Sequence, residues 1–358
     1  MMITGTSLKC PICATLFEPA QNNVPYVTDR TAASNVARPE RISFCPECEV
    51  GIAFPQLTNE EIDGLYTDGD YWQEKAVRIF LPKNNPGQYV MAESRWQLVE
   101  NYLRSQGRLG LEKISILDIG GGHGFFGMAA SKSRRVILEK VSIVEKDKYF
   151  IQSAKLTWER ELPHIDFSVE ESIENISRER RFNLVVLSHV LEHLNDPKGI
   201  ISSAAGRMFP GGLIFIDLPN RDYLFKKDIF PHVLFFSGKS LEKLLTDMGF
   251  EVEFIEYFGW NRETSSLNFR NERKFISYLA KLLYKLRFLI PIGISKRFFD
   301  WHLGASRNDS DGTWKGCWLR SVPSEMKVPL LILELPYTAI PIWTLFGLTS
   351  AYVSTLKA

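Results

Sequence analysis

The chain has 358 residues and a formal net charge of +1, with 45% hydrophobic and 24% charged residues. These values are typical of globular proteins and exclude a disordered or fibrous chain. The near-zero net charge also argues against the basic field of most nucleic-acid-binding proteins. The N-terminal residues lack the basic and apolar segments of a signal peptide, which predicts a cytoplasmic protein.

Composition divides the chain into three regions. Residues 1–55 hold four of the five cysteines and many turn-forming residues. Residues 56–112 show apolar side chains at helical spacing, such as Trp96 and Val99. Residues 113–358 alternate short β-type runs with helical stretches, which indicates a parallel sheet covered by helices. We therefore expect a small N-terminal domain, a helical linker and an α/β core.

Seven apolar runs are the predicted strands of this core. The first five are far enough apart for a crossover helix between each pair. The last two are separated by a gap too long for a bare loop, so residues 259–349 are expected to form a helical insertion. The predicted strands are Ile114–Ile119, Val141–Glu145, Ile165–Val169, Leu184–Ser188, Leu213–Leu218, Val252–Tyr257 and Ala351–Leu356.

The strongest local signal is a glycine-rich turn directly after the first predicted strand. Asp118 precedes Gly120, Gly122 and Gly124. Glycines permit a sharp turn and the close approach of a ligand. Glu145 ends the next strand, where an acid can accept hydrogen bonds from both hydroxyls of a ribose. An acid two residues before the turn suits a cationic ligand with an amino group better than a pyrophosphate, which favours S-adenosylmethionine over a dinucleotide.

Further motifs follow in a definite order. They are Leu191-Glu192-His193, Pro210-Gly211-Gly212, and Phe230-Pro231-His232 before a Phe-Phe-Ser turn. Together with the glycine turn, they resemble the motifs of class I S-adenosylmethionine-dependent methyltransferases over about residues 89–258 and the final strand. The resemblance implies a Rossmann-like, seven-stranded α/β sheet whose last strand is antiparallel.

The same resemblance implies the residues of a cofactor site. Asp118 would support the amino end of S-adenosylmethionine, Glu145 its ribose, and Ser172 with Ile173 its adenine. Ser188 and the neighbouring histidine would face the methyl group. The implied cofactor-binding residues are Asp118, Gly120, Gly122, Gly124, Glu145, Ser172, Ile173 and Ser188.

Four cysteines form two Cys-x-x-Cys pairs, Cys10 with Cys13 and Cys45 with Cys48. Two such pairs can supply the four thiolates of a structural Zn²⁺ site, which leaves no open position for catalysis. Two redox pairs are the alternative, but neither lies in a thioredoxin-like pattern. With Gly51–Pro55, the region resembles the zinc-ribbon leader of bacterial methyltransferases associated with sugars and cell-surface polysaccharides. That resemblance implies structural zinc and a sugar or glycan acceptor.

His232 is the first candidate for a catalytic residue. It follows the fifth predicted strand, where a histidine could take a proton from a substrate hydroxyl. Capping the next helix or packing on Phe235 is an equal alternative. His189 is the second candidate. With Glu192, His193 and His232 it resembles the magnesium-binding cluster of small-RNA 2′-O-methyltransferases. A structural role for His193 under the fourth strand is the favoured interpretation.

Two segments of the predicted insertion raise the question of a membrane. Residues 271–300 have the pattern of a basic amphipathic helix, which is typical of membrane surfaces or partner proteins. Residues 328–348 are apolar and long enough to span a bilayer, but prolines interrupt them. Packing on the sheet or on a second subunit is the preferred interpretation of both. Peripheral contact with the inner face of the membrane is a hypothesis that a lipid-linked glycan substrate would explain.

The sequence thus predicts methyl transfer from S-adenosylmethionine to a small-molecule or glycan acceptor, with a hydroxyl of a sugar, nucleotide sugar or lipid-linked glycan as the first choice. One alternative is an RNA methyltransferase whose zinc ribbon binds substrate, against which the neutral charge weighs. Another is a non-catalytic zinc scaffold with a degenerate methyltransferase fold. The glycine turn and Glu145 weigh against that scaffold.

Overall fold

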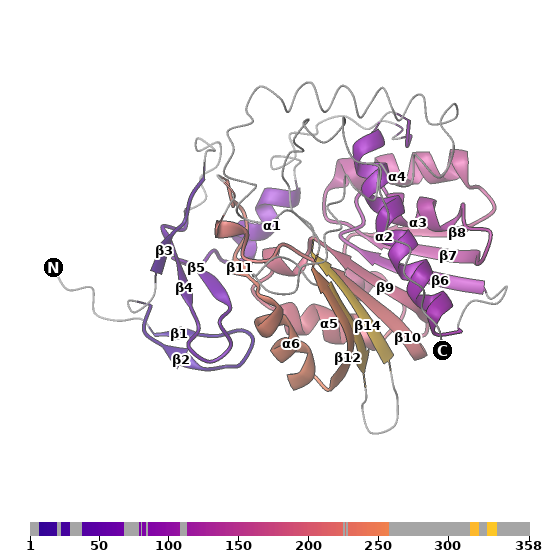
Figure 1. Ribbon diagram of the computed structural model, residues 1–358. Coiled ribbons are helices and arrows are strands. Elements are labelled where there is room, and N and C mark those ends of the chain that lie inside the picture. The colour runs from indigo at the N-terminus through magenta and orange to yellow at the C-terminus, as the bar shows by residue number, and fades with distance from the viewer. Residues whose placement is uncertain are drawn as a thin grey trace, which may run out of the picture.

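The computed structural model describes residues 7–19, 23–28, 38–67, 79, 81–83, 85–107, 113–224, 226, 228–257, 316–321 and 328–334. Within these residues, a large sheet with helices on its faces forms the core, and a smaller sheet built mainly from the N-terminal segment lies beside it (Figure 1).

The core sheet has eight strands in the order β12-β13-β14-β10-β9-β6-β7-β8. From β14 to β8 every neighbouring pair is parallel, whereas β13 is antiparallel to both of its neighbours. The strands are β6 (Lys113–Ile119), β7 (Ile137–Val144), β8 (Asp166–Glu170), β9 (Phe182–Ser188), β10 (Met208–Asp217), β12 (Phe250–Tyr257), β13 (Gly316–Ser321) and β14 (Val328–Glu334).

The edge beyond β10 differs from the prediction. Within the described residues the sheet has eight strands rather than the seven predicted for the whole core, because β13 and β14 both join it. Both lie in residues 259–349, so the expectation of a helical insertion is wrong for the described part of that range. The antiparallel strand is β13, while the predicted final strand Ala351–Leu356 lies outside the described residues.

Strand β14 also changes the interpretation of the apolar segment 328–348. Its residues Leu330 to Leu333 pair in parallel with Ile214 to Asp217 of β10. Its proline, Pro329, opposes Arg320 of β13. Residues 335–348 and 271–300 lie outside the described residues. Among the residues that are described, no helix is long and apolar enough to cross a bilayer.

The helices cover the two faces of the core sheet according to the period-two pattern of its strands. In β9, Leu184 and Val186 pack under one set of helices, and Val185 and Leu187 under the other. The first set is α2 (Pro86–Ser105), α3 (Phe125–Ala130) and α4 (Lys148–Glu161), which contribute side chains such as Trp96, Phe126 and Trp158. The second set is α5 (Pro197–Ala205) and α6 (Gly238–Asp247), with Ile201 and Leu241.

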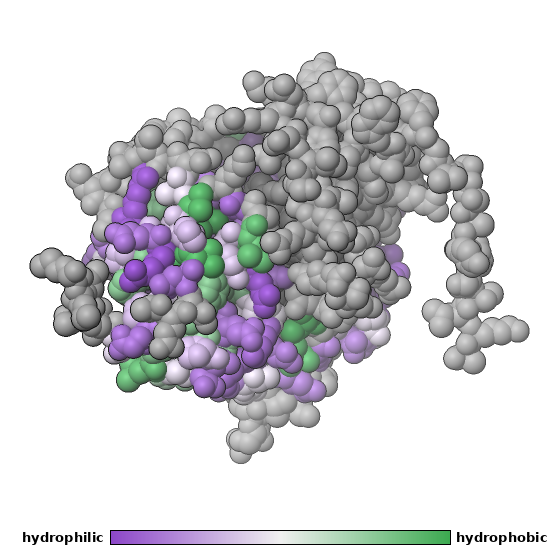
Figure 2. All heavy atoms as spheres, turned by 60° about the vertical axis from the view of Figure 1, so that its left-hand side comes forward, coloured by the Kyte–Doolittle hydropathy of each residue, from purple (hydrophilic) through white to green (hydrophobic). Residues whose placement is uncertain are grey.

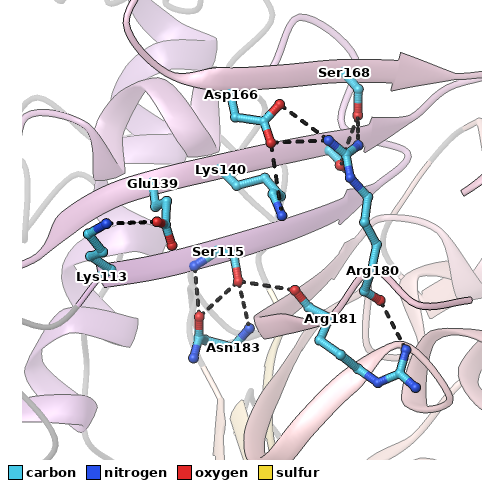
Figure 3. A network of polar contacts seen from close by, with 10 residues as sticks. Lys113, Ser115, Glu139, Lys140, Asp166, Ser168, Arg180, Arg181 and Asn183 are labelled. Carbon is cyan, nitrogen blue, oxygen red and sulfur yellow. Dashed lines mark hydrogen bonds and ion pairs between the residues drawn. The ribbon is translucent and has the colours of Figure 1, made fainter. Parts of the chain in front are cut away.

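A polar network joins strands near the amino-terminal end of the sheet, where each of these strands begins (Figure 3). Ser115 of β6 bonds to the side chain of Asn183 in β9, with an Oγ–Oδ1 distance of 2.8 Å. Arg180 reaches Ser168 and both carboxylate oxygens of Asp166 in β8. These contacts fix the register of the strands at the end opposite to the glycine turn.

The smaller sheet has the strand order β11-β5-β4-β3, and a two-stranded hairpin of β1 and β2 lies next to it. Strand β11 comes from the core segment, so the two parts of the chain share one sheet. Residues 56–112 contain the helices α1 and α2. The bounds are β1 (Leu8–Lys9), β2 (Leu16–Phe17), β3 (Asn23–Pro25), β4 (Arg41–Phe44), β5 (Gly51–Phe54), β11 (Leu234–Phe235) and α1 (Asn59–Thr67).

Figure 2 views the molecule from the side that carries β1–β5, and its described surface mixes hydrophobic with hydrophilic residues. Leu16 of β2 is the most exposed large hydrophobic side chain in the described part of the chain, at 66%. Isolated apolar side chains of this kind are normal on protein surfaces.

Candidate active site

The carboxyl ends of β6 to β10 meet at one edge of the sheet, and backbone hydrogen bonds continue past the strands there. Gly120 donates to the carbonyl of Val144 at 2.8 Å, and His189 donates to that of Asp217 at 2.7 Å. This edge is where open α/β sheets bind their ligands. It brings together the predicted residues of the glycine turn and those that follow β7, β8 and β9.

The three glycines of the turn adopt backbone conformations that side chains disfavour. Gly120, Gly122 and Gly124 have φ angles of +68°, +52° and +73°. At Gly122 an added Cβ would meet only a Phe150 carbon at 3.8 Å, so the space above its backbone is open. At Gly124 a Cβ would lie 2.4 Å from Nε1 of Trp158. The turn therefore exposes backbone on one side and packs tightly on the helix α4 on the other.

Backbone amides hold the carboxylate of Glu145. Its Oε2 accepts from Gly122 at 3.1 Å, and its Oε1 accepts from Lys146 at 2.8 Å and Asp147 at 3.0 Å. Burial raises the pKa of Glu145, while these amides oppose that shift. The side chain remains half-exposed at the sheet edge, where it can accept hydrogen bonds from a sugar's hydroxyls.

Asp118 lies under the glycine turn at the end of β6. Burial raises its pKa to about 7, against the opposing charge of Arg95 and with a contribution from Glu145. Arg95 comes from helix α2 and forms a salt bridge with Asp217 at the end of β10. The sequence reasoning did not single out Arg95, since only tertiary packing brings it to this edge.

Asp217 connects the ends of β9 and β10. Its carboxylate accepts from Ser188 Oγ at 3.0 Å and lies 3.8 Å from His189 Nε2. His189 has a φ of +55°, which is uncommon for a residue with a side chain. Among the described residues, Asp217 Oδ1 and His189 Nε2 are buried without a hydrogen-bond partner. Such atoms are typical of sites where a ligand completes the bonding.

Ser172 and Ile173 follow β8 and begin the short 3-10 helix η1 (Ile173–Asn175). Ser172 caps this helix and bonds to the Glu174 side chain. Ile173 is buried and packs with Ile176 in the core. The structure therefore places both residues at the correct edge, and their contact with adenine stays a prediction.

His232 lies on the loop before β11 and is buried beside an acidic partner. Its Nδ1 lies 2.9 Å from Oδ2 of Asp222, which begins the 3-10 helix η3 (Asp222–Leu224). Burial favours the neutral acid, but the charge and hydrogen bond of His232, with Lys226 at 2.8 Å, hold the pKa of Asp222 well below its usual range. Asp222 was not among the predicted residues, because a single acid in a turn carries no pattern.

Three histidines surround Glu192 in the 3-10 helix η2 (Leu191–His193). Its Oε1 lies 3.1 Å from His189 Nδ1 and 3.8 Å from His193 Nε2. His193 bonds through Nδ1 to Tyr66 of α1 at 3.0 Å, and its ring meets that of His232 edge to face. Burial lowers the pKa of His193, so its imidazole is neutral near pH 7.

This cluster has a ligand set that could also hold a metal ion. Glu192, His193 and His232 each offer a donor atom, all within 4.8 Å of one another. In the described residues, Glu192 Oε2 and His232 Nδ1 are both buried without a hydrogen-bond partner, although His232 Nδ1 lies 2.9 Å from the Asp222 carboxylate. The prediction gave His193 a structural hydrogen bond under the fourth strand. In the structure His193 bonds to Tyr66, which lies on α1.

The four N-terminal cysteines converge on one point. Their sulfur atoms all lie within 4.8 Å of one another, with Cys10–Cys48 at 3.5 Å and Cys13–Cys45 at 3.4 Å. Four thiolates around one Zn²⁺ ion at about 2.3 Å would be about 3.8 Å apart, so this donor set fits that ion after a small expansion.

The two cysteine pairs are built alike. In each, the residue after the second cysteine donates its amide to the carbonyl of the first cysteine, and it has a left-handed backbone. These residues are Ala14, with φ +62°, and Glu49, with φ +64°. The repeated turn brings the two thiolates of each pair close together, which supports one ion shared by both pairs.

Comparison with known proteins shows similarity to methyltransferases. Residues 78–254 match the family described as a methyltransferase domain. A ubiquinone biosynthesis O-methyltransferase of Xanthomonas euvesicatoria pv. vesicatoria (strain 85-10) is 26% identical over 194 residues, which is 49% of this chain and 79% of that protein. The protein of the same name from Coxiella burnetii (strain Dugway 5J108-111) is 28% identical over 109 residues, 30% of this chain and 44% of that protein.

Solved structures with similarity to the chain include two methyltransferases. Magnesium protoporphyrin IX methyltransferase from Synechocystis PCC 6803 with bound SAM has a TM-score of 0.39 at 16% identity, over 56% of this chain and 88% of that one. The plantazolicin methyltransferase in complex with SAH has a TM-score of 0.42 at 14% identity, over 73% and 97%.

The matching domain covers the glycine turn, Glu145 and the three histidines of the cluster, and the similar curated proteins are O-methyltransferases. A parallel sheet with a glycine turn after its central strand carries these residues at one edge. The match to a methyltransferase domain over residues 78–254 and the similarity to O-methyltransferases support an S-adenosylmethionine-dependent methyltransferase.

Proposed function

We propose that this enzyme transfers a methyl group to a hydroxyl of a small-molecule acceptor, and that His232 takes the hydroxyl proton. The observation that carries the proposal is the distance of 2.9 Å between His232 Nδ1 and the Asp222 carboxylate. A buried acid at Nδ1 favours the tautomer with its proton on that nitrogen, which leaves Nε2 as a base. The O-methyltransferase relatives support an oxygen as the acceptor atom.

The cofactor residues would act through position and charge. When bound, S-adenosylmethionine supplies an activated methyl group on a sulfonium sulfur. Asp118, beneath the turn, would face the cationic amino group, and the Glu145 carboxylate would accept from the ribose hydroxyls. Gly122 leaves open space above its backbone for the ligand. Ser188 and His189 end β9 beside these groups and would border the methyl group.

The reaction then requires the acceptor oxygen to lie in line with the methyl group, and one proton to leave the acceptor hydroxyl. The acceptor oxygen forms a bond to the methyl carbon as the sulfur–carbon bond breaks, which leaves S-adenosylhomocysteine. The hydroxyl proton moves to Nε2 of His232, and Asp222 stabilises the positive ring. Because the donor is already activated, holding the oxygen in line with the methyl group supplies much of the rate.

The sugar or glycan acceptor expected from the N-terminal resemblance remains a prediction, because the similar curated proteins are named for ubiquinone biosynthesis. We infer a small acceptor because His232 and His193 are mostly buried, so the reactive group must enter a confined space.

We also propose that the four cysteines bind one structural Zn²⁺ ion. The supporting observations are the convergence of four sulfur atoms and the repeated backbone turn at Ala14 and Glu49. Metal analysis of the purified chain should find one zinc per chain. Cys48→Ser should lose it and unfold at a lower temperature, whereas full thermal stability in the zinc-free protein would refute a structural role.

The proposed base is tested with methyl-tritiated S-adenosylmethionine and two acceptors, a catechol and a nucleotide sugar. His232→Gln should bind the cofactor with unchanged affinity in calorimetry and transfer methyl groups at least tenfold more slowly to the acceptor that the wild type uses. His164→Gln, at a histidine outside the cluster, is the control. An unchanged rate in His232→Gln would exclude the base.

A further inference from the structure

We propose that the N-terminal sheet forms part of the active site, with Tyr26 as a positioning residue for His232. This inference rests on the proposed role of His232. The segment concerned is residues 228–237, which carries His232 and the strand β11. Neither the family match, which begins at residue 78, nor the cofactor motifs include the N-terminal strands that hold this segment.

The first connection is continuous strand pairing. Strand β11 is antiparallel to β5, with Leu234 opposite Ile52 and Phe235 opposite Gly51. The amide of Ala53 donates to the carbonyl of Val233 at 2.9 Å, directly after His232 in the chain. The outer strand of the N-terminal sheet is therefore made by the residues that follow the proposed base.

The close fit at Gly51 shows how tightly the two parts join. A Cβ added there would lie 2.7 Å from Ile42 Cγ2 and 3.0 Å from Phe235 Cβ. The 2.7 Å approach to Ile42 of β4 is closer than real Cβ atoms come, and the 3.0 Å approach to Phe235 of β11 is tight, so glycine at position 51 suits β5 to packing between its two neighbouring strands.

The second connection runs through Tyr26. Its hydroxyl lies 2.9 Å from the carbonyl oxygen of His232 and 3.2 Å from that of Ile229, and both oxygens accept from it. Its ring packs edge to face on Phe235. The hydrogen bond to the backbone of the histidine itself links the N-terminal sheet to the base without any contact with the ring nitrogens.

Two more bonds reinforce this side of the segment. The amide of Ile229 donates to the carbonyl of Val27 at 3.1 Å, and Thr28 Oγ1 donates to Asp228 at 2.9 Å. Residues 26–28 therefore contact the first half of the segment, and β5 contacts its second half.

The core holds the same segment from the other side. The amide of Val233 donates to the carbonyl of Glu192 at 2.8 Å, and Asp222 contacts the His232 ring. His232 thus lies between the core, which orients its ring, and the N-terminal sheet, which fixes its backbone. If the N-terminal sheet loosens, the ring loses its defined distance to Asp222.

The cysteine cluster belongs to the same packed unit. Cys10, Cys45 and Cys48 are buried in one hydrophobic cluster with Val233, Leu234 and Phe236. Glu49, directly after the last cysteine, lies 2.6 Å from Lys239 and 3.6 Å from Arg221 of the core. Because these ion pairs are exposed, the apolar contacts supply most of the coupling. A metal ion that orders the cysteines would therefore also order Val233, Leu234 and Phe236, which closely follow His232 and pack in the same cluster.

The first test is Tyr26→Phe in the full-length chain, with Tyr223→Phe as the matched control. Both tyrosines pack on Phe235, but of the two only Tyr26 donates to the His232 carbonyl in the described structure. Hydrogen exchange at Ile229, His232 and Val233 should quicken at least tenfold in Tyr26→Phe and stay unchanged in Tyr223→Phe. Amides of β6 and β9 should be unaffected in both variants.

A readout specific to positioning is the tautomer of His232 in nitrogen-15 spectra of histidine-labelled protein, assigned with His232→Gln. The wild type should carry the proton on the nitrogen that faces Asp222. Tyr26→Phe should give averaged nitrogen shifts, and Tyr223→Phe the wild-type ones. Wild-type exchange and tautomer in Tyr26→Phe would overturn the inference.

The second test removes zinc from the protein with a chelator and maps hydrogen exchange. Protection should fall in residues 228–237 and in β5, while β6, β7 and β9 keep theirs and S-adenosylmethionine still binds in calorimetry. Unchanged protection of residues 228–237 would contradict the inference. Because neither readout needs methyl transfer, failure of the proposed base in His232→Gln is a separate outcome.

Discussion

The amide of Gly122 donates a hydrogen bond of 3.1 Å to Oε2 of Glu145, which joins the glycine turn after β6 to the acid after β7. The other carboxylate oxygen is held by two amides of its own turn. The two features that the sequence suggests for a nucleoside ligand thus form one preorganised unit. A carboxylate fixed in this way loses little freedom when a ribose binds.

Glu145→Ala removes both the ribose acceptor and the partner of the Gly122 amide. We expect the affinity for S-adenosylmethionine to fall at least tenfold, since a hydrogen bond to a charged group contributes about 1.5–3 kcal/mol. Calorimetric titration measures this. Glu139→Ala is the control, because Glu139 lies near the start of β7, the strand that Glu145 follows, and pairs with Lys113 there. Equal affinities in the two variants would exclude Glu145 from the site.

The affinity for S-adenosylmethionine should depend on pH through Asp118. Burial raises the pKa of this acid to about 7, so its carboxylate becomes the main form only above neutrality. A cationic amino group binds the carboxylate, and affinity should therefore rise about tenfold between pH 6 and pH 8. Asp118→Asn should bind more weakly at pH 8 and show a flat profile. The wild-type slope in that variant would assign the titration to another group.

The same shift has a consequence for stability. An unfolded aspartate has a pKa of about 3.9, so the folded chain holds the extra proton between about pH 4 and pH 7. The contribution of Asp118 to the free energy of unfolding is therefore present below this window and is lost as the pH rises through it. Denaturant unfolding of wild type and Asp118→Asn across this range should show the variant becoming more stable relative to wild type as the pH rises, because asparagine has no charge to bury.

Asp222→Asn separates the orientation of the base from cofactor binding. The amide keeps the size of the side chain but loses the charge beside His232, so the positive ring is no longer stabilised. Methyl transfer in a single turnover should slow about 10- to 100-fold, with unchanged affinity for S-adenosylmethionine. Asp247→Asn, at an exposed acid of α6 that pairs with Lys243, should behave like wild type. Full activity of Asp222→Asn would contradict the proposed pair.

Two glycines should respond in opposite ways to alanine. At Gly124, φ is +73° and a Cβ would lie 2.4 Å from Trp158, so Gly124→Ala should cost about 2–4 kcal/mol of unfolding free energy. At Gly64 in α1, a Cβ meets nothing within 4 Å, and alanine should stabilise by about 0.5–1 kcal/mol. Thermal unfolding of both variants compares them. A neutral Gly124→Ala would show that the turn is not packed as described.

Much of the core could be predicted because its signals are local. Apolar runs such as Leu184–Ser188 match β9, and the glycine turn follows its strand as expected. Strand β13 was missed because Gly316–Ser321 contains only three apolar residues and shows no clear alternation. Strand β14 was included in the expected helical insertion, since an apolar run alone does not distinguish a strand from a helix.

In the candidate site, too, residues marked by a local pattern could be predicted, and residues brought in by tertiary packing could not. The position of Glu145 and Ser188 at one edge of the sheet followed from the sequence, because parallel strands bring their carboxyl ends together. Their contact with the cofactor stays a prediction. Arg95 and Asp222 were not predicted, since one approaches Asp217 only through packing of α2, and the other lies in a turn without a motif. The partner of His232 in the N-terminal sheet, Tyr26, lies 206 positions away in the chain, beyond the reach of any local pattern.

The most direct test of the central claim is calorimetric titration of the zinc-loaded chain with S-adenosylmethionine, repeated on Gly122→Arg. The open space above Gly122 is where the ligand is proposed to lie, so a long side chain there should fill the site. We predict saturable binding of one molecule per wild-type chain and no detectable binding by a Gly122→Arg variant that unfolds like wild type. Absence of binding by the wild type, or equal binding by both proteins, would contradict this account.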